Sequence, residues 1–220
     1  MKLVIFDLFG TLFQYKVKHN PYRQLIKFGQ AQGRRVRESD ARNIMSLNYG
    51  IREIANHFEI NAPSGLFHKL ESQIDEEIES LTVFEGVDDI FCALKEINIQ
   101  IAICSNLAMP YGKAIDNLLS NYTFSRFLSY EMHLIKPDVE MYRMISESTS
   151  IGARESLFVG DNYDCDYAGP LNCGFHARHL IRHAASNDIV INSLEEVLRI
   201  VKKIHNCERT CAFLSNIIQQ

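Results

Sequence analysis

The stretch KLVIFDLFGTLF, residues 2–13, decides the fold of this chain. Its residues 3–6 form an apolar run with β-branched side chains, which is typical of a short strand buried on both faces. Asp7 follows at once, and a carboxylate is too costly to bury in the middle of such a strand. We therefore expect Asp7 where the strand ends, beside a turn at Gly10 and Thr11 that offers free amides. Ligands bind at the carboxyl ends of strands in open α/β sheets, so Asp7 is a candidate nucleophile.

Composition excludes several classes of function. The 220 residues are 46% hydrophobic and 23% charged, which suits one large globular domain or a core with an insertion. The formal net charge of −4 provides no basic surface for nucleic acid or anionic lipid. No apolar run approaches the roughly 20 residues that span a bilayer, and the N-terminal run is too short for a signal peptide. We expect a cytoplasmic protein with no nucleic-acid or membrane partner.

A helical pattern replaces the strand pattern after Phe13 and continues to about Leu81. Asn20-Pro21 is a helix-start signal, Gly33 is a helix-end signal, and Pro63-Ser64 opens a segment with a long apolar stripe. The helical block interrupts an α/β pattern. We interpret residues 14–83 as an inserted cap, with hinges in residues 14–20 and 79–85.

Strand and helix patterns alternate from Phe84 onward. Such alternation predicts a parallel sheet with right-handed crossovers. The predicted fold is α/β, a Rossmann-like three-layer core formed by residues 1–13 and 84–204 with an inserted all-helical cap. Residues 205–220 form a C-terminal extension of unknown role. The predicted strands are residues 100–104, 127–130, 156–160 and 175–180, and the predicted helices are residues 86–97, 110–119, 138–148, 163–173 and 193–204.

Three of the predicted strands end in polar groups that can meet in one crevice. These groups are Asp7, Ser105-Asn106 and Asp161, with Asp166 at the start of the next helix and Lys136 on a loop. Several carboxylates repel one another unless a positive charge lies between them. Lys136 supplies one charge, and a hard divalent cation such as Mg²⁺ would supply two.

Four motifs at this crevice resemble those of the haloacid dehalogenase superfamily, in the subgroup with a helical cap after the first strand. They are FDLFGTL from Phe6, ICSN from Ile103, IKPD from Ile135 and VGDNYDCDYAGPLNCG from Val159, in that order along the chain. The resemblance extends from Leu3 to about Leu180.

The resemblance implies a role for each matching residue. Asp7 resembles the nucleophile that forms a covalent aspartyl intermediate, and Thr11 resembles the hydroxyl that braces the nucleophile loop. Lys136 resembles the lysine that offsets the charge of the nucleophile and the phosphoryl group. The implied catalytic residues are Asp7, Thr11, Ser105 and Lys136, and the implied substrate-binding residues are Phe9, Gly10, Ser105, Asn106 and Lys136.

A magnesium site is also implied by the resemblance. Its ligands would be Asp7, the main-chain carbonyl of Phe9 and Asp161, with Asp166 as an outer acid that orients water on the metal. The implied activity is Mg²⁺-dependent hydrolysis of a small phosphorylated metabolite through an aspartyl phosphate, by a monomer or homodimer.

Phe9 departs from the phosphatase pattern, which has a second Asp at this position. That acid protonates the leaving group, and general acid–base help is worth about 10²–10⁴ in rate. Three explanations remain open: a substrate with a good leaving group such as an acyl phosphate, a substitute acid from the cap, or a catalytically weak binding protein. The candidate substitute acids are Tyr15, His19 and Tyr22.

A metal-free 2-haloacid dehalogenase is the first enzymatic alternative, because a departing halide needs no proton. Such enzymes replace the Gly-Asp pair of the fourth motif, whereas this chain keeps Gly160-Asp161, the phosphatase form. A negative Asp161 without a metal would also repel a carboxylate substrate. The candidate carboxylate-binding residues on the cap are Arg23, Arg34, Arg35 and Arg37.

The six cysteines are interpreted as reduced thiols that pack as small hydrophobic side chains. Cys207 and Cys211 would share one helix face near His205, but this trio lacks the fourth ligand of a typical zinc site. A metal site there is not expected.

Overall fold

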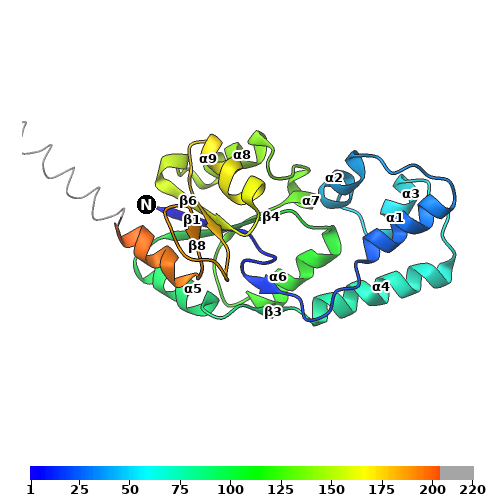
Figure 1. Cartoon of the computed structure of the whole chain (residues 1–220), viewed down its shortest axis with the longest axis horizontal. Coiled ribbons are helices and arrows are strands. Elements are labelled where there is room, and N and C mark those ends of the chain that lie inside the picture. The colour runs from blue at the N-terminus through cyan, green and yellow to red at the C-terminus, as the bar shows by residue number, and fades with distance from the viewer. Residues whose placement is uncertain (204–220) are drawn as a thin grey trace, which may run out of the picture.

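A six-stranded parallel sheet forms the centre of the computed structural model, which describes residues 1–203. β1 (Leu3–Phe6) lies between β4 (Gln100–Ser105) and β6 (Ser156–Gly160). β5 (Ser125–Leu128) extends the sheet beyond β4, and β7 (His176–Leu180) and β8 (Val190–Ile191) extend it beyond β6. The predicted parallel α/β core is confirmed (Figure 1).

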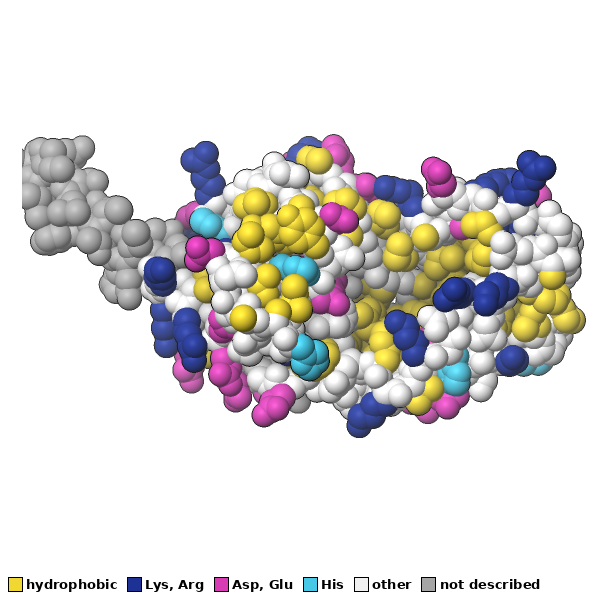
Figure 2. All heavy atoms as spheres, viewed as in Figure 1, with side chains coloured by type: hydrophobic (Ala, Val, Ile, Leu, Met, Phe, Trp, Pro, Cys, Tyr) yellow, Lys and Arg dark blue, Asp and Glu magenta, His cyan; other side chains and the backbone are white. Residues whose placement is uncertain are grey.

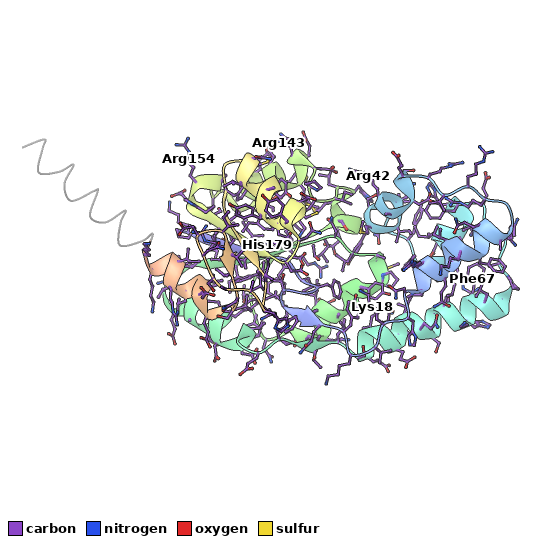
Figure 3. The ribbon with its side chains drawn as sticks, in the orientation of Figure 1. Lys18, Arg42, Phe67, Arg143, Arg154 and His179 are labelled. Atoms are coloured by element: carbon purple, nitrogen blue, oxygen red, sulfur yellow. The ribbon has the colours of Figure 1, made fainter. Side chains whose placement is uncertain are left out.

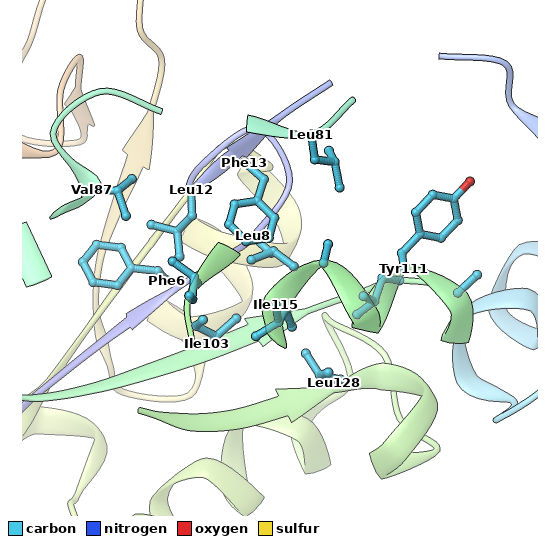
Figure 4. Packing of buried hydrophobic residues seen from close by; sticks show 14 of the residues in the cluster. Phe6, Leu8, Leu12, Phe13, Leu81, Val87, Ile103, Tyr111, Ile115 and Leu128 are labelled. Atoms are coloured by element: carbon cyan, nitrogen blue, oxygen red, sulfur yellow. The ribbon is translucent and has the colours of Figure 1, made fainter. Parts of the chain in front are cut away.

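Alternate residues of β1 enter two different hydrophobic clusters, which explains why the whole run is apolar. Val4 and Phe6 belong to the larger cluster, together with side chains of α5 (Val87–Glu96), α6 (Lys113–Leu118) and the helix at residues 195–203. Figure 4 shows Phe6 within this cluster. Leu3 and Ile5 face the opposite way, toward α8 (Val139–Thr149). Helices therefore cover both faces of the sheet, as the three-layer prediction requires.

Four helices between β1 and α5 lie together at one end of the molecule, at the right of Figure 1. α1 begins with Pro at its first position, and Gly33 follows its end with a φ of +93°. The chain enters and leaves this group through β2 (Phe13–Gln14) and β3 (Thr82–Val83), which pair antiparallel. The helical block is thus confirmed, and its movement as a cap remains a prediction. The helices are α1 (Pro21–Ala31), α2 (Ser39–Ser46), α3 (Ile51–His57) and α4 (Ser64–Glu79).

Some predicted elements differ from those observed. The strand predicted at residues 127–130 ends at Leu128, because Ser129 begins α7 (Ser129–Met132). The Ser129 hydroxyl donates to the carbonyl of Met45 at 2.6 Å and accepts from the Leu107 amide at 3.0 Å. The helix predicted at residues 163–173 begins as a π-helix (Tyr163–Ala168) and continues as α9 (Gly169–Asn172). The helix predicted at residues 110–119 begins as a 3₁₀ turn (Met109–Gly112) and continues as α6. The paired strands β2 and β3, the edge strand β8 and the 3₁₀ turn Ala153–Glu155 were not predicted.

The described cysteines, Cys92, Cys104, Cys165 and Cys173, are free thiols, as predicted for this part of the chain. The prediction that they pack as small hydrophobic side chains is wrong for Cys92, which is exposed. The interpretation of His205, Cys207 and Cys211, and the extension at residues 205–220, lie outside the described residues. Among the described helices, none combines the length and apolar character needed to cross a membrane.

Candidate active site

The ends of the three central strands lie at one edge of the sheet. Phe6 pairs in register with Ile103 of β4 and with Val159 of β6. The residues that follow these strands therefore lie side by side, as the sequence predicted. Ser105 donates from its hydroxyl to Oδ1 of Asp7 over 3.1 Å, which joins the end of β4 to the end of β1.

Lys136 lies at the centre of the site, and its ammonium makes three hydrogen bonds. Nζ donates to Oδ1 of Asp7 at 2.8 Å, to Oδ1 of Asp166 at 2.6 Å and to the carbonyl oxygen of Cys104 at 2.7 Å. These contacts account for all three of its protons. The side chain is only 2% exposed. Lys136 therefore fixes the relative positions of two buried carboxylates.

Asn106 holds the loop that carries Lys136. Its Nδ2 donates to the carbonyl oxygen of Lys136, and its Oδ1 accepts from the amide of Lys136, both at 2.8 Å. The sequence predicted a substrate contact for Asn106 and missed this loop-holding role. One amide proton of Asn106 remains for a substrate, so the predicted contact is compatible with the observed pair.

Three carboxylates, those of Asp7, Asp161 and Asp166, have oxygen atoms within 4.8 Å of one another. Burial and, to a smaller extent, the charge of Asp166 raise the pKa of Asp7 to about 6, against the opposing attraction of Lys136. Partial burial and the charge of Asp7 also raise the pKa of Asp161. Burial would lower the pKa of Lys136, but Asp166 and Asp7 hold it well above its ordinary value. The cluster is thus short of positive charge.

Two glycines allow these carboxylates to approach the backbone. Gly10 has a φ of +86°, and a Cβ there would lie 2.1 Å from an Asp161 carboxylate oxygen. A Cβ at Gly160 would lie 2.3 Å from an Asp166 carboxylate oxygen. The expectation of a free Gly10 amide is wrong, because this N–H donates to the carbonyl oxygen of Phe13 at 2.8 Å. Gly10 serves the site through its lack of a side chain.

The donor set fits a hard divalent cation. Three carboxylates face one ammonium, and Asp161 has no ion pair among residues 1–203. Oδ1 of Asp7 is used by Lys136 and Ser105, and both oxygens of Asp166 are used, by Lys136 and by the amide of Asn162. The Asp161 carboxylate and the second oxygen of Asp7 are therefore the side-chain groups best able to contact a metal, with Asp166 behind them.

Thr11 is fully buried, and its hydroxyl has no hydrogen-bond partner among the described residues. Its predicted bracing role is therefore not supported by a side-chain contact. The carbonyl oxygen of Thr11 accepts from Nη2 of Arg182 at 2.6 Å, and this guanidinium also stacks 3.7 Å from the centre of the Phe84 ring. Arg182 braces the nucleophile loop, and no motif in the sequence marked it.

Phe9 lies in an aromatic cluster, where the phosphatase pattern would place an acid. Its ring stacks on Tyr15 with centroids 5.1 Å apart and meets Tyr111 edge-on at 6.1 Å. Burial and Glu77 raise the pKa of Tyr15, which makes it a poorer proton donor. His19 is hydrogen-bonded to Glu76 at 2.8 Å. Burial and Glu53 also raise the pKa of Tyr22, and His19 does not line the cavity beside Phe9. Two of the three candidate substitute acids are thus weakened as proton donors, and the third lies outside that lining.

A cavity of about 320 Å³ lies between the helical block and the core, next to this cluster. Phe9 and Asn106 line it from the core, and Tyr22 and Arg23 line it from α1. Figure 2 shows the surface hollowed between these two parts of the molecule. The other arginines considered for carboxylate binding lie elsewhere, since Arg34, Arg35 and Arg37 line a separate cavity. Arg34 is also held by Asp40 through two hydrogen bonds of 2.6 and 2.7 Å.

The fold and the site define an α/β protein with a buried aspartate and lysine at the ends of its central strands. A family model described as a haloacid dehalogenase-like hydrolase matches residues 1–174, and the chain belongs to this family of hydrolases. None of the curated proteins compared with the chain matches it.

Solved structures with the same fold include both phosphatases and dehalogenases. A HAD phosphatase from Thermococcus onnurineus is 16% identical with a TM-score of 0.64, over 91% of this chain and 98% of that one. A HAD family enzyme from Bacteroides thetaiotaomicron, in complex with magnesium and inorganic phosphate, is 16% identical with a TM-score of 0.63, over 84% and 96%. A 2-haloacid dehalogenase from Pseudomonas syringae pv. tomato is 16% identical with a TM-score of 0.62, over 92% and 99%. At these identities the likeness shows the fold alone.

Proposed function

We propose that this protein is a Mg²⁺-dependent hydrolase of a small phosphorylated metabolite, acting through an aspartyl phosphate on Asp7. The observation that carries the proposal is the charge of the site, where three carboxylates surround one ammonium and Asp161 is left without an ion pair in the described chain. A divalent cation would balance this charge. A solved HAD family enzyme of the same fold contains magnesium and inorganic phosphate, which supports the proposal.

Asp7 is positioned for nucleophilic attack. Lys136 and Ser105 both bind Oδ1, so the carboxylate has a fixed orientation at the end of β1. Attack on phosphorus forms a bond from Asp7 to phosphorus, breaks the bond to the leaving oxygen and leaves the electron pair on that oxygen. Water then cleaves the aspartyl phosphate and restores Asp7.

Lys136 and Asn106 prepare the site before the substrate arrives. The ammonium offsets negative charge at the nucleophile, and Asn106 fixes the lysine loop. Asp7, Asp161 and the carbonyl of Phe9 would hold a magnesium ion, with Asp166 behind them. The bound ion would supply positive charge to the phosphoryl oxygens. The helical block at residues 14–83 would act as a cap that excludes water and contacts the substrate.

The environment of Phe9 favours a substrate whose leaving group needs little protonation. Phe9 cannot transfer a proton, burial raises the pKa of Tyr15 and of Tyr22, and His19 does not line the cavity beside Phe9. An acyl phosphate, or an ester of an acidic alcohol, would therefore be hydrolysed faster than a simple alkyl phosphate.

Hydrolysis assays with and without Mg²⁺ test the proposal. Acetyl phosphate and p-nitrophenyl phosphate should release phosphate in Mg²⁺ and not in EDTA, and Asp7→Asn should abolish this release. The Asp161→Asn variant should need a much higher Mg²⁺ concentration to reach the wild-type rate. Phosphate release that persists in EDTA would contradict the magnesium site, and no release from any substrate would favour a binding protein.

A metal-free 2-haloacid dehalogenase is the second candidate, and the aromatic ring of Phe9 favours it because a departing halide needs no acid. Arg23, which lines the cavity beside Phe9, would then contact the carboxylate of the substrate. Chloride release from 2-chloropropionate, unaffected by EDTA, would establish this activity and overturn the phosphatase proposal.

A further inference from the structure

The cavity beside Phe9 has aromatic walls that can contact a flat molecule. Phe9, Tyr15 and Tyr111 form one wall, and Tyr22 and Met45 contribute from the helical block. Its volume of about 320 Å³ is at the small end for ligand pockets. Because Phe9 and Asn106 directly flank the proposed catalytic groups, this cavity can receive the part of a substrate that does not react.

Two basic side chains border the cavity without ion-pair partners. Lys18 and Arg23 line it, and neither forms an ion pair within residues 1–203. The ammonium of Lys18 lies 5.3 Å from the centre of the Tyr15 ring, which places it beside the aromatic wall. Figure 3 shows Lys18 near the junction between the helical block and the core. The side chains are therefore available for a negatively charged ligand.

The first turn of α1 adds to this positive environment. α1 has 11 residues, and Asn20, Pro21, Tyr22 and Arg23 at its start all line the cavity. No acidic residue lies in the first turn and the Asn20 side chain does not cap it, while the Glu77 carboxylate accepts from the Asn20 amide at 2.7 Å. The partial positive charge of a helix N-terminus favours an anion at this position.

The hydroxyl of Tyr22 provides an independent indication of a ligand. The residue is 9% exposed, and its hydroxyl is buried with no hydrogen-bond partner in the described chain. Burial and the charge of Glu53 raise the pKa of this phenol, so it stays protonated and can donate. A buried donor without an acceptor is costly, and an anionic ligand would supply the acceptor.

Glu77 is the acidic residue that lines the cavity, and three hydrogen bonds from neutral groups stabilise its carboxylate. It is 3% exposed, and its carboxylate accepts from the amides of His19 and Asn20 and from the hydroxyl of Tyr111. Two basic side chains, Lys18 and Arg23, against the one carboxylate of Glu77 leave the lining with a net positive charge. A cationic ligand is therefore disfavoured.

We propose that this cavity binds a second anionic group of the substrate, such as a carboxylate, carried on a compact planar body between the aromatic side chains. This inference rests on the proposed function, because it assumes that the reacting phosphoryl group lies at Asp7. The substrate class is then a phosphorylated small organic acid. Lys18, Arg23 and the hydroxyl of Tyr22 would bind the second anion.

A matched pair of substrates tests the inference. 4-Carboxyphenyl phosphate and 4-carbamoylphenyl phosphate have nearly the same shape, and they differ in the charge of the distal group. The ratio of their kcat/KM values should favour the carboxylate by roughly tenfold or more in the wild type. Lys18→Met, Arg23→Met and Tyr22→Phe should each lower this ratio, and the double variant of Lys18 and Arg23 should bring it near one.

Lys27→Met is the control, since Lys27 is an exposed residue of α1 that does not line the cavity. It should leave the ratio unchanged. A wild-type ratio near one, or a ratio that the three variants do not alter, would overturn the inference while phosphate release still supported the proposed function.

Binding of unreactive analogues separates the two proposals. 4-(Phosphonomethyl)benzoate should bind more tightly than 4-(phosphonomethyl)benzamide in titration calorimetry, and Lys18→Met and Arg23→Met should remove the difference. If neither phosphate ester is hydrolysed, the proposed function fails, and these affinities alone decide the inference. Equal affinities for the two analogues would contradict the anion site.

Discussion

Replacement of Lys136 by methionine should destabilise the protein in a pH-dependent way. Methionine keeps much of the side-chain volume but removes the ammonium, which makes hydrogen bonds of 2.8 Å to Asp7, 2.6 Å to Asp166 and 2.7 Å to the carbonyl of Cys104. Asp7 and Asp166 would then be buried carboxylates without a counter-charge. Removal of one partner from a buried ion pair typically costs about 3–5 kcal/mol.

The pH dependence follows from the pKa of Asp7. The pKa of Asp7 rises from 3.8 to about 6 on folding, so the folded protein holds this proton more tightly than the unfolded chain. The free energy of unfolding therefore falls by about 3 kcal/mol in total as the pH rises from about 4 toward 6. Without Lys136 the pKa of Asp7 should rise further. The loss then continues to higher pH, and the variant should differ from the wild type more at pH 8 than at pH 5.

Urea unfolding in EDTA at pH 5 and pH 8 measures this difference. Far-UV circular dichroism is the suitable probe, because the sequence contains no tryptophan. Lys95→Met is the matched control, since Lys95 is exposed on α5. Adding Asp7→Asn to Lys136→Met should restore part of the stability at pH 8.

The reasoning would be refuted by a loss below about 1 kcal/mol at pH 8, which is the range of surface ion pairs. A loss of equal size at both pH values would also refute it. In that case packing, and not charge, would account for the role of Lys136.

Three further substitutions probe other parts of the structure. Gly160→Ala should cost at least about 1–3 kcal/mol in urea unfolding, because its Cβ would overlap a buried carboxylate, whereas Gly65→Ala, with open space around it, should not destabilise. Arg42→Gln removes the ion pair with Asp138, which should weaken the attachment of α2 to the lysine loop and lower kcat/KM several-fold. Arg143→Gln breaks only an exposed ion pair within α8 and should leave kcat/KM unchanged. Equal kcat/KM values for the two variants would exclude a role for the Arg42–Asp138 pair. Phe9→Asp should raise the phosphatase rate if the missing acid limits turnover, and a folded variant with no gain would exclude that explanation.

The position of the central carboxylates could be predicted from local pattern alone. An apolar run that ends abruptly at Asp7 indicates a buried strand and locates its end. The runs that end at Ser105 and Asp161 show the same pattern, and parallel strands bring their carboxyl ends to one edge. The role of Lys136 could be predicted only with the help of the family motif, because a loop sequence does not show that its lysine contacts three acceptors.

The contacts that brace the site could not be predicted, because their partners are distant in sequence. Arg182 lies 171 residues from Thr11, and Arg42 lies 96 residues from Asp138, which it binds through two hydrogen bonds of 2.6 and 2.7 Å. A sequence does not show whether an arginine is free or bound to a partner, since this depends on which loops lie next to each other in the folded chain.

The sequence by itself determined the α/β order, the helical block and the residues at the strand ends, because hydrophobic periodicity and abrupt changes in polarity are local properties. Only the tertiary structure decided which groups contact one another. Asn106 holds the lysine loop, and the Gly10 amide is hydrogen-bonded. Lys18 and Tyr22 border one cavity with Phe9. Hydrogen bonds and enclosed space depend on distances between segments, and those distances exist only once the chain has folded.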